Sequence, residues 1–319
     1  MFSISKYSGL PKSLIILKLV ITSDIIILVI ETRRMAMNFS KTIQMYIFDG
    51  NPNGRIMCEL SNWNGRIYKI SRNELNKFSE RNDSGFTGVY FLFGRNEYND
   101  ETIYVGEAEN ILNRLRQHIS EDYWNDCVVL ISKDNILNKA HVKYLENKFY
   151  TLAKEAERSN VLNVNTPTRS TISEYDEAML DEFISNAKLL VNTLGYKVFD
   201  SIEDSAVQNQ NMQTKFYIKA ARGANAIGTM LSDGFAVYKD SEIASPTTQS
   251  MAESLIKLRN SLIEKGIINS EFKFTRDYIF TSSSLAAAVV MGRNANGRTE
   301  WKTEEHKSLK DIEEENVSN

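Results

Sequence analysis

The sequence predicts a mixed α/β (α+β) fold, with a three-stranded antiparallel sheet flanked by helices, a small N-terminal β unit and a separate C-terminal α+β domain. Two apolar runs, residues 88–93 and 103–106, alternate in the manner of strands. The polar segment 95–101 between them is long enough to close a hairpin. A third run at 128–131 predicts another strand, and the periodic segment 139–158 predicts a long helix.

The two predicted hairpin strands each place a tyrosine close to a glycine. The first contains Gly88-Val89-Tyr90 and the second contains Tyr104-Val105-Gly106. Because side chains alternate along a strand, pairing the two runs is expected to bring Tyr90 and Tyr104 near each other on one face. Their phenols would then be available for chemistry.

Two predicted helices add further polar side chains. Residues 107–110 begin the first helix, in which Arg114 and His118 are four positions apart and share one face. The long helix 139–158 carries Glu146 at the edge of its apolar arc. Its buried positions are expected to be Leu145, Phe149, Leu152 and Ala156, and those of the first helix Leu112, Leu115 and Ile119.

This ordered set of side chains resembles the GIY-YIG nuclease superfamily over about residues 85–200. Gly88-Val89-Tyr90 matches the first motif and Tyr104-Val105-Gly106 the second, with valine in place of isoleucine in both. The family's helix arginine then falls on Arg114, its histidine on His118 and its metal-binding glutamate on Glu146. A late asparagine of the family falls on Asn163 or, as the alternative, on Asn165.

The resemblance implies a Mg²⁺-dependent (or Mn²⁺-dependent) endonuclease that hydrolyses phosphodiester bonds, with DNA as the expected substrate. It implies that Tyr90 helps to deprotonate the attacking water, that Tyr104 and His118 position groups or relay the proton, and that Arg114 braces the phosphate. Each residue alone also has a structural explanation, such as strand packing for a tyrosine. The alternative is therefore a non-catalytic nucleic-acid-binding protein that retains the fold.

Composition and charge narrow the classes of protein that fit. The chain has 319 residues and a formal net charge of −3. Residues 85–200 carry −6 and residues 215–303 carry +4, so affinity for phosphate is expected mainly outside the nuclease-like segment. Cys58 and Cys127 lack metal-ligand spacing, which favours a reduced, cytoplasmic chain. Three histidines argue against a multi-histidine zinc site.

Residues 1–36 are expected to lie outside the fold. Their apolar stretch, 14–30, is interrupted by Lys18 and Asp24 and is shorter than the roughly 20 residues of a membrane helix. A leader peptide and a membrane tether are alternatives, and only a tether would make the membrane a partner. A third hypothesis is upstream sequence that is not translated, because Arg33-Arg34 can be encoded by AGGAGG, a ribosome-binding sequence, just before Met35.

The remaining segments divide by composition. Residues 37–84 predict a β-rich unit, with Ser71 and Glu74 spaced as a capping box for a short helix. Ser173 begins a helix in the same way, and residues 201–214 read as a linker. Residues 215–303 resemble a small uncharacterised domain often appended to bacterial nucleases, in which Arg293, Arg298 and Trp301 either contact nucleic acid or form an ordinary turn with a core tryptophan. Residues 304–319 predict an acidic, disordered tail.

Overall fold

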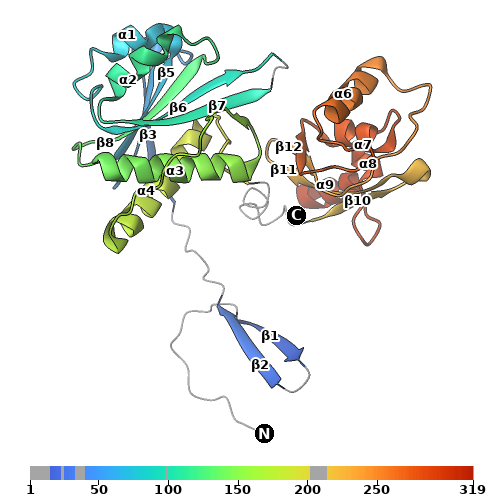
Figure 1. Cartoon of the computed structure of the whole chain (residues 1–319). Helices are drawn as coiled ribbons and strands as arrows, with labels where there is room; N and C mark the ends of the chain where they lie inside the picture. Colours follow the sequence, from blue (N-terminus) through green and yellow to red (C-terminus); the bar gives the residue numbers. More distant parts are fainter. Residues whose placement is uncertain (1–14, 23–24, 33–39, 98–99, 202–213, 319) are drawn as a thin grey trace. The chain divides into compact units, whose positions relative to one another are not determined.

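The computed structural model describes residues 15–22, 25–32, 40–97, 100–201 and 214–318 (Figure 1). Its contacts separate a unit at Met1–Thr42 from a unit at Ile43–Asn319. In the first unit, strands β1 (Ile15–Thr22) and β2 (Ile25–Thr32) form an antiparallel hairpin. The rest of the predicted 1–36 extension falls outside the described residues. Within the ranges above, no helix combines the length and apolar character needed to cross a membrane.

The second unit is built on a seven-stranded sheet with the order β3-β4-β5-β8-β6-β7-β9. The predicted three strands are adjacent in it as β8-β6-β7, and all neighbouring strands are antiparallel except β7 and β9. The β unit expected at 37–84 extends this same sheet, because β5 pairs with β8. The strands are β3 (Ile43–Ile47), β4 (Ile56–Leu60), β5 (Gly65–Ser71), β6 (Gly88–Arg95), β7 (Glu101–Ala108), β8 (Asp126–Ser132) and β9 (Asn160–Val161).

Helices cover both faces of this sheet, so the central strands bury side chains in both directions (Figure 1). Val89 and Phe91 face α3 (Lys139–Ala156) and α4 (Glu174–Thr193). Tyr90 and Leu92 face α1 (Leu75–Phe78) and α2 (Ile111–Gln117). Each fully buried apolar side chain contributes about 1.5–3 kcal/mol relative to an exposed one.

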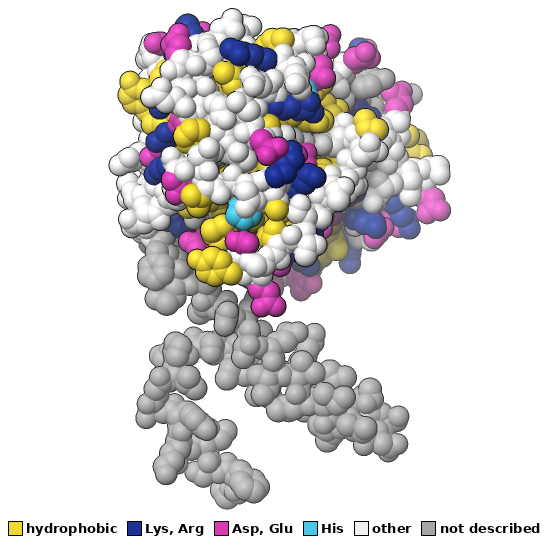
Figure 2. All heavy atoms as spheres, turned by 60° about the vertical axis from the view of Figure 1, so that its left-hand side comes forward, with side chains coloured by type: hydrophobic (Ala, Val, Ile, Leu, Met, Phe, Trp, Pro, Cys, Tyr) yellow, Lys and Arg dark blue, Asp and Glu magenta, His cyan; other side chains and the backbone are white. Residues whose placement is uncertain are grey.

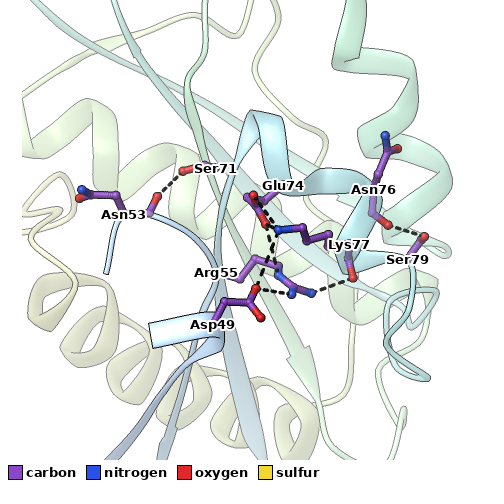
Figure 3. Close-up of polar contacts among 8 residues, drawn as sticks. All are labelled: Asp49, Asn53, Arg55, Ser71, Glu74, Asn76, Lys77 and Ser79. Atoms are coloured by element: carbon purple, nitrogen blue, oxygen red, sulfur yellow. Dashed lines mark hydrogen bonds and ion pairs between the residues drawn. The ribbon is translucent and has the colours of Figure 1, made fainter. Parts of the chain in front are cut away.

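Local capping follows the sequence at some helix starts and departs from it at others. The Ser173 hydroxyl accepts a hydrogen bond from the Asp176 amide, as predicted for α4. Ser71 makes no such cap, because its hydroxyl donates to the Asn53 carbonyl at 2.6 Å (Figure 3) and lies 3.1 Å from the Asp126 carboxylate. The prediction that Ile119 is buried is wrong: α2 ends at Gln117, a 3₁₀ turn follows, and Ile119 is 43% exposed.

The C-terminal region has its own sheet, with the order β10-β11-β12-β13, and its own core around Phe235 and Trp301. The predicted disordered tail is wrong, because Leu309 is buried and Ile312 packs beside it, which holds α9 against this core. Of the expected linker at 201–214, residues 202–213 fall outside the described residues. The elements are β10 (Phe216–Lys219), β11 (Asn225–Leu231), β12 (Gly234–Val237), β13 (Tyr278–Phe280), α6 (Glu253–Glu264), α7 (Ser283–Met291), α8 (Gly297–Glu300) and α9 (Leu309–Ser318).

Candidate active site at the open edge of strand β7

The pairing of β6 with β7 brings the two motif tyrosines together. Tyr90 lies opposite Gly106 and Tyr104 lies opposite Leu92, so both tyrosines occupy the same face. Their ring centroids are 6.3 Å apart. A Cβ atom at Gly106 would lie 2.3 Å from the Tyr90 hydroxyl oxygen, so the glycine leaves the space that the phenol occupies.

The Tyr90 hydroxyl is held by one side chain from α2 and one from the 3₁₀ turn that follows it. Arg114 Nε donates to it at 3.2 Å, and His118 Nε2 lies 2.9 Å from it. Both contacts agree with the predicted shared face of Arg114 and His118. Burial raises the pKa of the Tyr90 phenol well above its usual value, with the neighbouring Tyr104 adding to the shift. A free phenolate is therefore disfavoured at this position.

The His118 ring is fixed from its other side. Its Nδ1 lies 2.7 Å from the Glu121 carboxylate. An ionised carboxylate can accept a hydrogen bond but cannot donate one. That contact assigns the hydrogen to Nδ1 and leaves Nε2 as the acceptor, so the Tyr90 hydroxyl donates to His118. The backbone is anchored as well, because the Trp124 indole donates to the His118 carbonyl at 2.9 Å.

Glu146 approaches the site from the opposite face of the sheet, on α3. Its carboxyl is partly buried, and burial followed by the nearby Glu107 carboxylate raises its pKa to about 7. Glu107 is itself paired with the Lys139 ammonium at 2.9 Å. Among the residues that the structure describes, Glu146 makes no hydrogen bond and no ion pair of its own. A desolvated carboxylate without a partner has a strong affinity for a cation.

The side chains from both faces meet in a single cavity of about 350 Å³ at the edge of β7. Tyr90, Tyr104 and Arg114 come from one face, and Glu146 joins them from the other. The helices α2 and α3 lie on opposite sides of the sheet (Figure 1), and the cavity wraps around the strand edge between them. The full lining is Tyr90, Tyr104, Glu107, Ala108, Glu109, Arg114, Lys139 and Glu146.

Asn163 stands beside this cavity and not in its lining. Its side-chain amide donates to the Val105 carbonyl at 2.7 Å and accepts from the Val105 amide at 3.0 Å. It thereby continues the short β7/β9 pairing by one side chain and leaves β7 open from Gly106 onward. Asn163 therefore holds the backbone of β7 in place. The alternative, Asn165, is exposed on the loop.

Several residues of the site were not predicted from the sequence, among them Glu107, Lys139 and Glu121. Glu107 follows the second motif directly, and strand alternation at a covered edge would turn it away from Tyr104. Its place on an edge strand could have indicated it, because side chains from both faces of a sheet can reach one cavity at an edge. Glu121 lies three residues beyond His118, a spacing typical of side chains that meet across a helical turn.

The side chains that line the cavity could hold a divalent cation, with Glu146 as its ligand. The described part of the chain holds no group of three or more histidine, cysteine, aspartate or glutamate side chains suited to a metal ion. Mg²⁺ does not need such a group, since it usually keeps several waters and binds through one or two carboxylates. The unpaired, desolvated Glu146 carboxylate supplies that ligand, whereas Glu107 is occupied by Lys139.

Of the candidate contact residues of the C-terminal region, Trp301 belongs to the core and the two arginines form ion pairs at the surface. Trp301 is fully buried, its ring centroid lies 4.5 Å from that of Phe235, and its indole donates to the Ser283 carbonyl. Arg293 pairs with Glu300 and Arg298 pairs with Glu313, each at 2.7 Å. The core-tryptophan alternative is therefore confirmed for Trp301, which cannot stack on a base.

Comparison with known proteins informs one part of the chain. Residues 216–313 match the model of a domain of unknown function, DUF4357. The match agrees with the expected uncharacterised C-terminal domain and extends its end beyond residue 303. A search of curated proteins found no match, and neither did a search of solved structures. No GIY-YIG nuclease family model matches the chain, so the resemblance of residues 85–200 to a nuclease rests on the motif residues alone.

Proposed function

We propose that this chain is a metal-dependent endonuclease that hydrolyses phosphodiester bonds in DNA. The observation that carries the proposal is the cavity at the β7 edge, where a phenol pair, a guanidinium and an unpaired carboxylate line the same space. Hydrolysis of a phosphodiester needs an activated water and stabilisation of the charge on the phosphate. These side chains offer both.

Arg114 is the group that would stabilise the phosphate. Its Nε is committed to Tyr90 and its Nη1 to Gln117 at 2.7 Å, so the guanidinium is oriented before substrate arrives. A planar guanidinium presents several N–H donors to phosphate oxygens. Because its position is already fixed, little reorganisation is needed as negative charge develops in the transition state.

Tyr90, His118 and Glu121 would move the proton of the attacking water. As the water oxygen bonds to phosphorus, its proton passes to the Tyr90 oxygen while the Tyr90 proton passes to His118 Nε2. The resulting imidazolium faces the Glu121 carboxylate, 2.7 Å from Nδ1. The two transfers leave Tyr90 neutral throughout, which suits a phenol whose pKa is raised by burial. Tyr104 lines the cavity beside Tyr90 and would position the water.

Glu146 would hold Mg²⁺ or Mn²⁺. A cation bound there supplies charge stabilisation for the scissile phosphate and the departing oxygen. Glu146 must be ionised to bind it, and a pKa of about 7 makes binding sensitive to pH near neutrality.

The surface charge suits a substrate that is held by several weak contacts. Figure 2 shows a face on which basic and acidic side chains are interspersed. The matched domain at residues 216–313 carries 13 basic and 12 acidic side chains, a net charge of +1, so several separate contacts would hold the phosphate backbone. The buried free thiols of Cys58 and Cys127 accord with a reducing, cytoplasmic setting, which we propose as the compartment.

A plasmid-nicking assay in the presence of Mg²⁺ tests the proposal. Wild type is expected to nick supercoiled DNA, and Arg114→Ala and Glu146→Ala are each expected to lower the rate by about 100-fold or more. Arg116→Ala and Glu155→Ala are matched controls, because these residues are exposed on the same two helices. Nicking that survives both site substitutions would reject the assigned site.

The same assay separates the enzyme from its alternative. A non-catalytic nucleic-acid-binding protein would bind DNA in a gel-shift experiment, but would not nick it with Mg²⁺ or Mn²⁺. Supercoiled, branched and single-stranded substrates in parallel would define the preferred nucleic acid.

A further inference from the structure

Strand β3 forms the other edge of the seven-stranded sheet, and its side chains are unusually apolar for an edge. Met45, Tyr46 and Ile47 are 45%, 58% and 39% exposed. The strand Ile43–Ile47 contains no charged residue and no proline, and its register with β4 has no bulge. Exposed edge strands of native proteins are usually protected by such features, since an open ladder otherwise pairs with another strand.

The backbone groups that point away from β4 can be identified. The Phe48 amide donates to the Arg55 carbonyl at 3.0 Å, so the pair Phe48/Arg55 is hydrogen-bonded. Hydrogen-bonded pairs alternate along an antiparallel ladder, so Tyr46 and Gln44 also bond to β4. The N–H and C=O groups of Ile43, Met45 and Ile47 therefore face the open edge.

We propose that β3 pairs with β3 of a second copy of this chain, antiparallel and centred on Met45. The outward-facing residues are symmetric about Met45, so Met45 meets its own copy and Ile43 meets Ile47, with two hydrogen bonds in each pair. Gln44 lies opposite Tyr46 in the same register. A two-fold axis requires a surface that is complementary to itself, and this strand meets that condition.

The charges flanking β3 agree with this register. Lys41 lies two residues before the strand and Asp49 two residues after it, so antiparallel pairing about Met45 places the basic end of each strand at the acidic end of the other. Asp49 is bound by Arg55 at 3.0 Å but remains 62% exposed (Figure 3). An opposite charge at each end favours this pairing over a parallel one, in which like charges would meet.

Sedimentation of the full chain over a range of concentrations tests the pairing. Wild type is expected to form dimers, and Met45→Lys is expected to raise the dimer Kd by about tenfold or more, because two lysines would face each other across the axis. Ile136→Lys is the matched control, since Ile136 is 50% exposed outside the sheet and its substitution should leave the Kd unchanged. A wild-type chain that stays monomeric throughout would overturn the proposal.

Cross-linking tests the register without depending on the charged variant. Met45→Cys is expected to form a disulfide-linked dimer on mild oxidation, because the two residues 45 are direct partners, whereas Ile136→Cys should not. The native Cys58 and Cys127 are buried and should not contribute. Equal cross-linking of the two variants would overturn the register. Slow hydrogen exchange at the Met45 amide in a monomeric chain would also overturn the proposal. It would mean that another segment of the same chain already bonds to this edge.

Discussion

The two edges of the seven-stranded sheet carry opposite chemistry. At the β7 edge, charged and phenolic side chains from both faces surround an open stretch of backbone that begins at Gly106. At the β3 edge, five uncharged residues present an unprotected ladder. The β7 edge is paired by β9 and by the Asn163 side chain as far as Val105, whereas among the described residues no strand pairs with the outer side of β3.

In the two proposals above, an edge strand serves two purposes. A sheet interior keeps its two faces apart, so side chains on opposite faces cannot act together. At an edge they can, and Arg114 and Glu146 share one cavity for this reason. Where an edge lacks polar side chains, its unpaired backbone N–H and C=O groups remain, and these can bond to another strand. The following variants test this contrast, beginning with the largest expected effect.

Gly106→Ala should disable the β7 edge. The added methyl group would lie 2.3 Å from the Tyr90 hydroxyl, so the phenol must move away from Arg114 and His118. We expect DNA nicking to fall by about 100-fold or more, since a displacement of about 1 Å can cost that much, and the free energy of unfolding to fall by about 1–3 kcal/mol. The nicking assay and urea denaturation measure the two effects.

Gly54→Ala is the control for that substitution, because its nearest neighbour is the end of the flexible Asn51 side chain at 3.3 Å. Nicking by Gly106→Ala at the rate of Gly54→Ala would mean that Tyr90 does not need its present position.

Asn163→Ala should destabilise the same edge without touching the cavity. The Val105 amide and carbonyl would both lose their partner, at a cost of about 1–3 kcal/mol in the free energy of unfolding. Asn165→Ala should be neutral, because that side chain is exposed. Urea denaturation distinguishes them, and equal stability of the two variants would argue against the strand-fixing role of Asn163.

The sequence predicted the centre of the site better than its surroundings. Tyr90 and Tyr104 share one face, and Arg114 and His118 share one face, as the strand and helix periods suggested. Glu146, which was assigned from the family resemblance, reaches the cavity from the other face of the sheet. Asn163 was assigned to the site but acts on the backbone of β7, which a pattern of residue types does not reveal. The expected disordered tail failed because Leu309 and Ile312 form an apolar stripe within an acidic segment.

Glu146→Gln should remove a pH dependence of stability. The folded-state pKa of about 7 lies above the usual value near 4.3, so the contribution of Glu146 is fully present below about pH 4.3 and is lost as the pH rises through 7. Without metal, wild type should lose about 1–2 kcal/mol between pH 5 and 8 that Glu146→Gln retains. Denaturation in a chelating buffer measures the difference.

Glu155→Gln, on the exposed side of α3, should retain the wild-type pH dependence. Mg²⁺ added at pH 8 should stabilise wild type but not Glu146→Gln. Parallel pH profiles for wild type and Glu146→Gln would show that the Glu146 carboxyl is not desolvated in solution.

Lys41→Glu at the β3 edge should give the smallest effect. It places a carboxylate toward Asp49 of the second copy, and an exposed pair of this kind is worth about 0.2–1 kcal/mol, or a few-fold in the dimer Kd. The change should vanish at about 1 M salt, where the Debye length is about 3 Å. A change in Kd that persists in high salt would indicate a different contact.

The central claim is that Arg114 and Glu146, from opposite faces of the sheet, act on the same phosphate. A double-mutant cycle of plasmid nicking with Arg114→Ala and Glu146→Ala tests it most directly. If both residues serve one transition state, the double variant should nick about as slowly as the slower single variant. Losses that multiply, or a single variant that nicks at the wild-type rate, would contradict a shared site.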